Sequence, residues 1–210
     1  MTSAFQNVID NAESISFNRK KKVAQTVSRD GIVRSTSLGG QTWEFEVKLP
    51  DGPAWTTYRP IVEQLEALDR VSTGTIQISK AGHSWINGYQ GNLVPAQQTN
   101  IVVTATNVST TTVSIVSGGT GLIAGQYRFK SGDLIQMGPT GKVYSVVNDV
   151  AHNATEITLN RPLRESTGTY TLSIGQAVTW TVICAKFPQW TIFARNQISW
   201  DGAFVFSEVL

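Results

Sequence analysis

The sequence contains little cysteine and little charge. Cys184 is its single cysteine, so an intramolecular disulfide framework and a metal site built from cysteines alone are excluded. Charged residues make up 15% of the chain, well below the usual figure of about 25%. The formal net charge of +2 gives no general reason to expect a nucleic acid, a membrane surface or an acidic partner.

Long hydrophobic runs are also missing. The N-terminal stretch MTSAFQNVIDNAESISF carries acidic and polar residues where a signal peptide needs a basic region followed by an apolar run. No uncharged apolar stretch is long enough to span a bilayer. We therefore expect a protein that is made in a cytoplasm, stays soluble and has no membrane partner.

The abundant residues are Thr, Ser, Gly and Val, a balance that favours strands over helices. The chain of 210 residues is long enough to bury a substantial core. The run TWEFEVKL alternates with period two, which predicts a half-buried strand. Its predicted buried side chains are Trp43, Phe45, Val47 and Leu49, and its predicted exposed ones are Glu44, Glu46 and Lys48.

Two further elements are predicted near this strand. Residues 22–28 and 32–37 form a hairpin around Arg29-Asp30-Gly31, because an Asp-Gly pair supplies the positive backbone angle of a tight turn. The run TTYRPIVEQLEALDR is the one predicted helix, capped by Thr56 or Thr57, with Pro60 in its first turn. Its apolar face consists of Ile61, Leu65 and Leu68.

The sequence pattern changes between residues 95 and 175, where short predicted strands rich in Thr, Val and Ile alternate with clusters of turn residues. This pattern and a length of about eighty residues predict a small OB-like β-barrel. All six tryptophans lie outside the stretch. We therefore predict a mainly β protein with a sheet domain of residues 1–94 plus 176–210, containing one helix, and an inserted barrel of residues 95–175. Phe204, Phe206 and Val209 are expected to share a core with Trp43 and Phe45.

Catalytic motifs are sparse, so we predict that the protein is not an enzyme and needs no cofactor or metal. His83 and His152 fall in different predicted domains, and Cys184 has apolar strand neighbours typical of a buried small side chain. The glycine-rich run at 118–126 lacks the Gly-Lys-Ser/Thr ending of a phosphate loop. A polysaccharide hydrolase needs two carboxylates roughly 5 to 10 Å apart, and no spacing in the chain predicts such a pair.

A few charged and aromatic residues are candidates for other roles. The run NRKKK at 18–22 is typical of a solvated strand edge, where lysines discourage association. Trp55, in the loop before the predicted helix, and Trp190, after a proline, are candidate interface anchors.

The order of these elements resembles the distal tail proteins of long-tailed bacteriophages. The segments TWEFEVKLPDGPAWTTYRPIVEQLEALDRVSTGTIQI and FPQWTIFARNQISWDGAFVFSEVL flank a small barrel, and FKSGDLIQMGPTGKVYSVVNDVAHNATEITLNRPLR is similar to segments of phage baseplate proteins. The resemblance implies a tail-tube-like sheet domain interrupted by an OB-fold. It also implies a hexameric ring at the tail tip, although the same fold builds rings of three as well as six.

The resemblance implies a structural role in the virion. The ring would join the tail tube protein to baseplate or receptor-binding components, leaving a central channel through which DNA passes. Channel walls in such tubes are commonly acidic, so Glu44 and Glu46 are candidates to face the lumen. Subunits in such a ring meet head to tail through two different surfaces.

One alternative function is a carbohydrate- or nucleic-acid-binding module, because OB-like barrels often bind oligomers on one face. This alternative predicts exposed aromatic side chains on the barrel. The middle stretch offers Tyr127, Phe129, Tyr144 and Tyr170.

Overall fold

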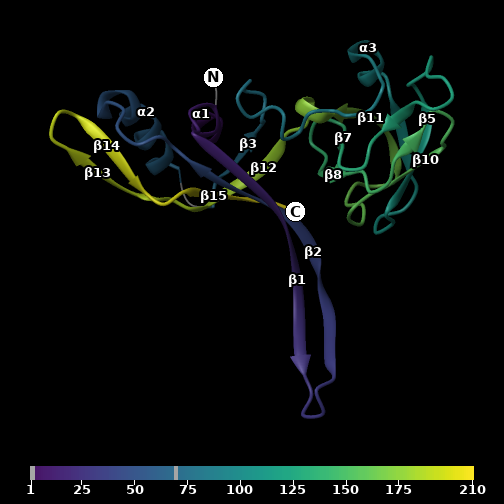
Figure 1. Ribbon diagram of the computed structural model, residues 1–210, viewed down its shortest axis with the longest axis horizontal. Coiled ribbons are helices and arrows are strands. Elements are labelled where there is room, and N and C mark those ends of the chain that lie inside the picture. The colour runs from purple at the N-terminus through teal and green to yellow at the C-terminus, as the bar shows by residue number, and fades with distance from the viewer. Residues whose placement is uncertain (1–2, 69–70) are drawn as a thin grey trace. The chain divides into compact units, whose positions relative to one another are not determined.

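The computed structural model describes residues 3–68 and 71–210 and is mainly β, as predicted (Figure 1). The chain divides into two units. The first comprises residues 1–74 and 182–210, and the second comprises residues 75–181. The two ends of the chain therefore build one unit.

A five-stranded sheet forms the frame of the first unit, in the order β1-β2-β15-β12-β3. Its strands are β1 (Ser14–Val27), β2 (Val33–Lys48), β15 (Phe204–Glu208), β12 (Trp180–Lys186) and β3 (Thr73–Ile76). The C-terminal strand β15 pairs antiparallel with both β2 and β12. The apolar end of the chain is therefore built into the middle of the sheet.

The alternation in TWEFEVKL produces the predicted buried face. Trp43, Phe45 and Val47 are buried, and Phe206 lies opposite Phe45 and Phe204 opposite Val47 in the register of β15 with β2. The prediction for Phe204 and Phe206 is confirmed. Strand period two places position 208 rather than 209 on this face, so Glu208 is buried and accepts a hydrogen bond from the Trp43 backbone N–H at 3.2 Å, whereas Val209 is only partly buried.

The described residues contain three α-helices rather than the one predicted. The first, α1 (Ala4–Asp10), begins after Ser3, whose hydroxyl accepts a hydrogen bond from the Gln6 N–H at 3.1 Å. Its Phe5 ring packs against Phe206 with ring centroids 5.2 Å apart. A helix of seven residues is too short to show a clear apolar period. Its existence therefore depends on capping and on packing against the sheet.

The predicted helix is α2 (Trp55–Glu66), but its ends differ from the prediction. Ala54 rather than Thr56 or Thr57 stands at the N-cap, without a side-chain capping bond. Pro60 therefore lies in the second turn, where its missing N–H leaves the Thr56 carbonyl without the usual helical donor. Ile61 and Leu65 are buried as predicted, whereas Leu68 lies beyond the helix and is 38% exposed.

Strands β1 and β2 form one long hairpin. The pairing runs from Ser14 opposite Lys48 to Val27 opposite Val33. The hairpin predicted at 22–37 is therefore only the outer part of a ribbon whose second strand continues through Gly39-Gly40 into the predicted TWEFEVKL strand. The pairing register shifts between Lys21, which lies opposite Gln41, and Val23, which lies opposite Ser37, as at a β-bulge. Gly31 has a φ of 75° in the turn, as the Asp-Gly pair predicts.

A second hairpin, β13 (Gln189–Phe193) and β14 (Gln197–Asp201), extends the first unit. Its turn places Arg195 at φ 72° and Asn196 at φ 62°. The Asn196 carbonyl accepts a hydrogen bond from the Trp55 N–H at 2.8 Å, which ties the turn to the start of α2.

The second unit is a curled antiparallel sheet that forms a half-barrel. Its strand order is β10-β5-β4-β11-β7-β8. Val146 and Leu159 form an isolated bridge, which brings the chain after β8 close to the chain after β10 and curls the sheet. The strands are β4 (Val102–Ala105), β5 (Thr112–Ser117), β7 (Leu134–Met137), β8 (Val143–Ser145), β10 (Glu156–Thr158) and β11 (Gly168–Ile174).

Smaller elements complete this unit: β6 (Tyr127–Phe129) paired with β9 (Val150–Ala151), the short helix α3 (Pro95–Gln98) and a 3₁₀ turn at Gly175–Ala177. The unit begins about twenty residues before the predicted boundary at 95. Hydrogen bonds explain this difference. The Asn87 side chain donates to the Gly175 carbonyl at 3.2 Å, and the Gln90 N–H donates to Asp133 at 2.8 Å.

Candidate assembly interface

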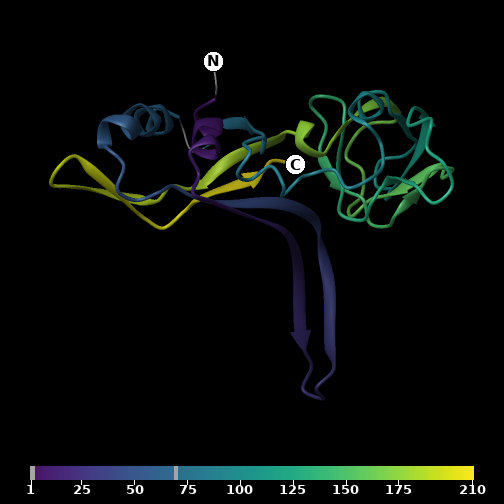
Figure 2. The same cartoon turned by 45° about the horizontal axis from the view of Figure 1, so that its top comes forward.

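The outer part of the long hairpin pairs with no third strand among the described residues of the first unit. The last pair between β15 and β2 joins Ser207 and Glu44, so residues 19–42 form a two-stranded ribbon that we call the arm. It extends about 25 Å beyond the sheet at about 3.3 Å per residue. Both views show the arm leaving the rest of the first unit with no other element of that unit against it (Figures 1 and 2). Residues 24–34 are all exposed.

Charge is divided sharply within the first unit. The arm carries six Lys or Arg residues and one Asp, a formal net charge of +5. The remainder of the first unit, which we call the body, carries five Lys or Arg and ten Asp or Glu residues, a net charge of −5. The overall charge of +2 hides this contrast. Opposite potentials on two surfaces favour head-to-tail contact between copies.

The end of the arm is apolar. Val27 and Val33 lie opposite each other in the last pair of the ribbon, and Ile32 is their neighbour in the turn. Their side chains are 68%, 62% and 57% exposed, respectively. We call these three residues the tip. The turn is well formed, since the Ser28 N–H donates to the Ile32 carbonyl at 2.9 Å and the Ile32 N–H donates to the Ser28 hydroxyl at 3.2 Å.

The body contains a pocket of about 690 Å³, within the range of about 300–1,000 Å³ typical of binding clefts. Residues of α1, of the end of α2 and the chain just after it, and of the end of β12, the start of β13 and the link between them line it. Glu66 is its acidic lining residue. Its larger apolar lining residues are Phe5, Leu65, Leu68, Phe187, Pro188 and Trp190.

Aromatic contacts hold the pocket walls in place. Phe187 meets Phe204 edge to face with ring centroids 4.9 Å apart, and Phe5 packs against Phe206 with ring centroids 5.2 Å apart. Both partners belong to the buried face of β15. Two of the pocket's aromatic lining residues are therefore held against the core of the sheet.

The structure brings the two candidate anchors together. Trp55 and Trp190 stack with ring centroids 4.8 Å apart, one from the first residue of α2 and the other from β13. Both indoles are partly buried. Trp190 also lines the pocket, whereas Trp55 supports it from outside. The sequence alone indicated each tryptophan separately and gave no sign that they pair.

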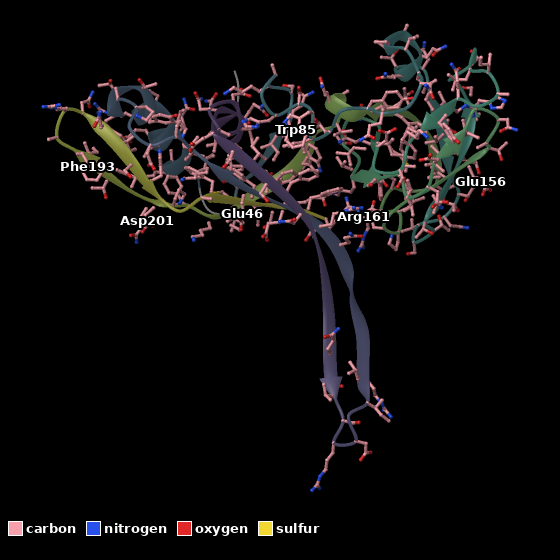
Figure 3. All side chains as sticks on the ribbon, viewed as in Figure 1. Glu46, Trp85, Glu156, Arg161, Phe193 and Asp201 are labelled. Atoms are coloured by element: carbon pink, nitrogen blue, oxygen red, sulfur yellow. The ribbon has the colours of Figure 1, made fainter. Side chains whose placement is uncertain are left out.

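Glu44 and Glu46 lie on the face of β2 opposite the buried aromatics. Glu46 is exposed and Glu44 partly so. Their cross-strand neighbours are mostly polar: Glu44 lies opposite Asn18 and Ser207, and Glu46 lies opposite Ser16 and Val205. Figure 3 shows Glu46 on this sheet. The two carboxylates therefore contribute to a polar face of the sheet.

The buried carboxylate of the second unit serves the fold. Asp133 accepts hydrogen bonds from the Gln90 N–H at 2.8 Å and the Lys130 N–H at 2.7 Å. Burial raises its pKa, and these backbone donors oppose that rise. Both oxygens of Asp133 thus connect loops of the half-barrel. This arrangement is typical of a structural acid.

The remaining candidate groups are the two histidines and the cysteine. His83 and His152 both lie in the second unit, contrary to the prediction that they fall in different domains. Within residues 3–68 and 71–210, no three His, Cys, Asp or Glu side chains are placed to hold a metal ion. Cys184 was predicted to be buried, but it is partly exposed because it lines the pocket.

Comparisons with known proteins add no family assignment. Neither the protein-family models nor the curated proteins searched contain a match to this chain. Among the helices of the described residues, none has the length and apolar character needed to cross a membrane.

Sequence reasoning missed the tip and the pocket. The two valines at the ends of VSRDGIV could have indicated the tip. Apolar residues beside a polar hairpin turn are exposed unless another surface covers them. The pocket had no comparable signal. Its lining comes from Phe5 and from residues 65–68 and 184–190, which only the folded sheet brings together.

Proposed function

We propose that this protein is a structural component of a bacteriophage virion, forming a ring at the distal end of the tail. The ring joins the tail tube to baseplate or receptor-binding components and leaves a central channel for DNA. The resemblance of the sequence to distal tail proteins motivates the proposal. The mainly β fold, with one unit built from both chain ends, is consistent with it.

The observation that carries the proposal is the basic arm beside an acidic body. A heterologous ring needs two different, complementary surfaces on each copy. The arm, at +5, and the body, at −5, meet that requirement within one unit. The arm is a projecting ribbon with free strand edges and an apolar end. Exposure of these features does not stabilise a single chain, but it favours contact with a partner.

The polar face of the first sheet suits the proposed channel. One face of an antiparallel sheet packs on its core while the other faces water. Glu44 and Glu46 lie on that water-facing side. In the proposed ring, these carboxylates line the lumen and repel the DNA backbone. DNA therefore passes through without binding.

The proposed neighbours of the ring follow from its position. The tail tube protein lies above it and other baseplate or tail-tip proteins lie below. The second unit, a separate half-barrel, contacts these tip proteins. The body and arm make the ring itself.

The aromatic side chains of the second unit favour this proposal over a carbohydrate- or nucleic-acid-binding module. Phe129 and Tyr144 are fully buried. The Lys130 ammonium lies 3.5 Å from the Tyr127 ring centroid and covers it, and the Tyr170 hydroxyl donates to the Ser166 carbonyl at 2.9 Å. These four aromatics do not form the open stacking platform that the alternative predicts.

The first experiment measures the molar mass of the purified full chain by light scattering, with negative-stain images of the same sample. We expect a closed oligomer with an open centre. Arg34→Glu, on the arm, is expected to shift the population towards monomer. The matched control is Arg164→Glu, the same charge change on an exposed side chain of the second unit. A strict monomer at every concentration, or equal effects of the two variants, contradicts the proposal.

A further inference from the structure

We infer that the tip of one copy's arm occupies the pocket of the neighbouring copy in the proposed ring. This inference rests on the proposed function and deepens it, because it names the contact that joins successive subunits. The occupant of the pocket is a second copy of this chain. The contact consists of Val27, Ile32 and Val33 against the apolar walls contributed by α1, α2 and the β12–β13 connection.

The tip requires cover that its own chain does not supply. All three tip side chains are more than half exposed, so the chain's own tip does not fill its own pocket. The three residues lie together at the end of the ribbon, since Val27 and Val33 are a direct cross-strand pair and Ile32 adjoins Val33 in the chain. An apolar patch at the end of a long polar ribbon is typical of a segment that inserts into a partner.

The pocket offers complementary chemistry. Its walls include Phe5, Leu65 and Trp190, so desolvated aliphatic side chains gain apolar contact there. Glu66 lines the same pocket and is exposed. Arg29 and Arg34 flank the tip in the chain and are exposed. Insertion of the tip therefore brings these arginines near the Glu66 carboxylate. This charge pairing favours one orientation of the arm in the pocket.

A basic ribbon with an apolar end also suits a nucleic acid, since arginines bind phosphates and apolar side chains wedge between bases. The acidic body favours the protein contact. A phosphate backbone is repelled by a body at −5, whereas the arm of a second copy is attracted to it. Nucleic-acid binding by the arm is therefore an outcome that the experiment distinguishes.

Cys184 makes the contact directly testable, because the chain's only cysteine lines the pocket. We would mix the double variant Ile32→Cys/Cys184→Ser, whose one thiol is on the tip, with the wild-type chain, whose one thiol is in the pocket. One of the two carries an affinity tag. A short bismaleimide that joins two thiols is added, and products are separated on a denaturing gel and located by peptide mass spectrometry. The matched control replaces Ile32→Cys by Phe193→Cys, on the exposed end of the β13–β14 hairpin (Figure 3).

We expect a one-to-one conjugate between the tip thiol and Cys184, formed roughly tenfold or more efficiently than with the Phe193→Cys control, because docking raises the local thiol concentration. The molar mass of the same samples is measured by light scattering before the linker is added. A ring without the conjugate overturns the inference and leaves the proposed function standing. A monomer without the conjugate overturns both.

Polyanion binding is tested with the same proteins and a random-sequence DNA duplex. We expect Ile32→Ser to weaken self-assembly at least several-fold while leaving retention of the duplex unchanged. If Ile32→Ser instead weakens DNA retention and leaves assembly intact, the arm is a nucleic-acid contact and the inference is wrong.

Discussion

The indole rings of Trp55 and Trp190 stack on each other, 4.8 Å apart between centroids and 21° from parallel. Trp55 is the first residue of α2, and Trp190 lies on β13, opposite Trp200 in the register with β14. The stack therefore joins the start of the helix to the second hairpin. Since Trp190 also lines the pocket, this contact links the stability of the first unit to the shape of its proposed docking surface.

We predict an energetic coupling between these two tryptophans. Stacked aromatic pairs contribute about 0.5–1.5 kcal/mol beyond their area burial. Trp55→Ala, Trp190→Ala and the double variant, compared with the wild type by urea denaturation, should show a coupling of that size. Strictly additive effects on the free energy of unfolding would show that the rings are neighbours without stabilising each other.

The buried face of β15 supports a second prediction. Phe206 is fully buried, lies opposite Phe45 and contacts Phe5. Phe206→Ala should lower the free energy of unfolding by about 3–5 kcal/mol, because it removes apolar burial and leaves a cavity. Phe193→Ala removes the same ring from a position that is 56% exposed. It should change stability by about 0.5 kcal/mol or less. Equal losses in chemical denaturation would contradict the placement of Phe206 in the core.

Local periodicity accounts for the part of the fold that was predictable. Alternation identified the buried face of β2 and the pair Phe204 and Phe206, because a strand's period of two directly reports which side chains share a face. The Asp-Gly turn identified the hairpin for the same local reason. The helix α1 was not predictable, since its seven residues depend on the Ser3 cap and on Phe5 packing against Phe206.

The candidate site was less predictable because it depends on tertiary structure. Trp55 was indicated by its predicted loop position and Trp190 by the proline before it, but their stacking joins residues 135 positions apart. The arm was predicted only in part, because the predicted hairpin ends at residue 37, whereas β2 continues through Gly39-Gly40 into TWEFEVKL. The contrast between basic arm and acidic body became visible only when the unit boundaries assigned each charge to a surface.

Asp51 should make the first unit sensitive to acid. Its carboxylate accepts a hydrogen bond from the Trp200 N–H at 2.8 Å. This bond lowers the pKa of Asp51 below its ordinary value of 3.8, with a smaller contribution from the Ser199 side chain. The folded state therefore favours the charged form. The resulting stability is present above pH 3.8 and is lost as the pH falls through the lower folded-state pKa.

Asp51→Asn should remove this dependence, because the amide oxygen still accepts the Trp200 N–H but does not titrate. The side chain is exposed, so solvent screening limits the effect to about 1 kcal/mol or less. Thermal denaturation from neutral pH down to about pH 3 compares the two proteins. Parallel curves for the wild type and Asp51→Asn would show that another group carries the acid sensitivity.

Tyr89 should make the second unit sensitive to alkali. Its hydroxyl donates to the Arg128 carbonyl and accepts from the Leu93 N–H at 3.0 Å. Burial raises the pKa of Tyr89 to about 12, from an ordinary value of 10.0. The folded state thus holds its proton more tightly than the unfolded chain. The stability from this group is complete below pH 10.0 and declines as the pH rises towards about 12.

Tyr89→Phe should lower the free energy of unfolding by about 1–3 kcal/mol at neutral pH, because the Leu93 N–H and Arg128 carbonyl lose a partner. It should also flatten the loss of stability above pH 10.0. Urea denaturation at several alkaline pH values measures both effects. A variant that keeps the full alkaline slope would assign that slope to a different tyrosine.

Assembly itself should depend on salt. The attraction between an arm at +5 and a body at −5 acts largely through solvent, where the screening length falls from about 10 Å at 0.1 M salt to about 3 Å at 1 M. The mass measured by light scattering should therefore fall as salt rises across that range at fixed protein concentration.

Ile32→Ser should lower the mass at every salt concentration without changing the slope, because it removes apolar contact and no charge. Arg34→Glu should lower the mass at low salt and flatten the slope, because it removes the attraction that salt screens. An oligomer whose mass is indifferent to salt and to Arg34→Glu would show that the charge contrast does not hold the ring together.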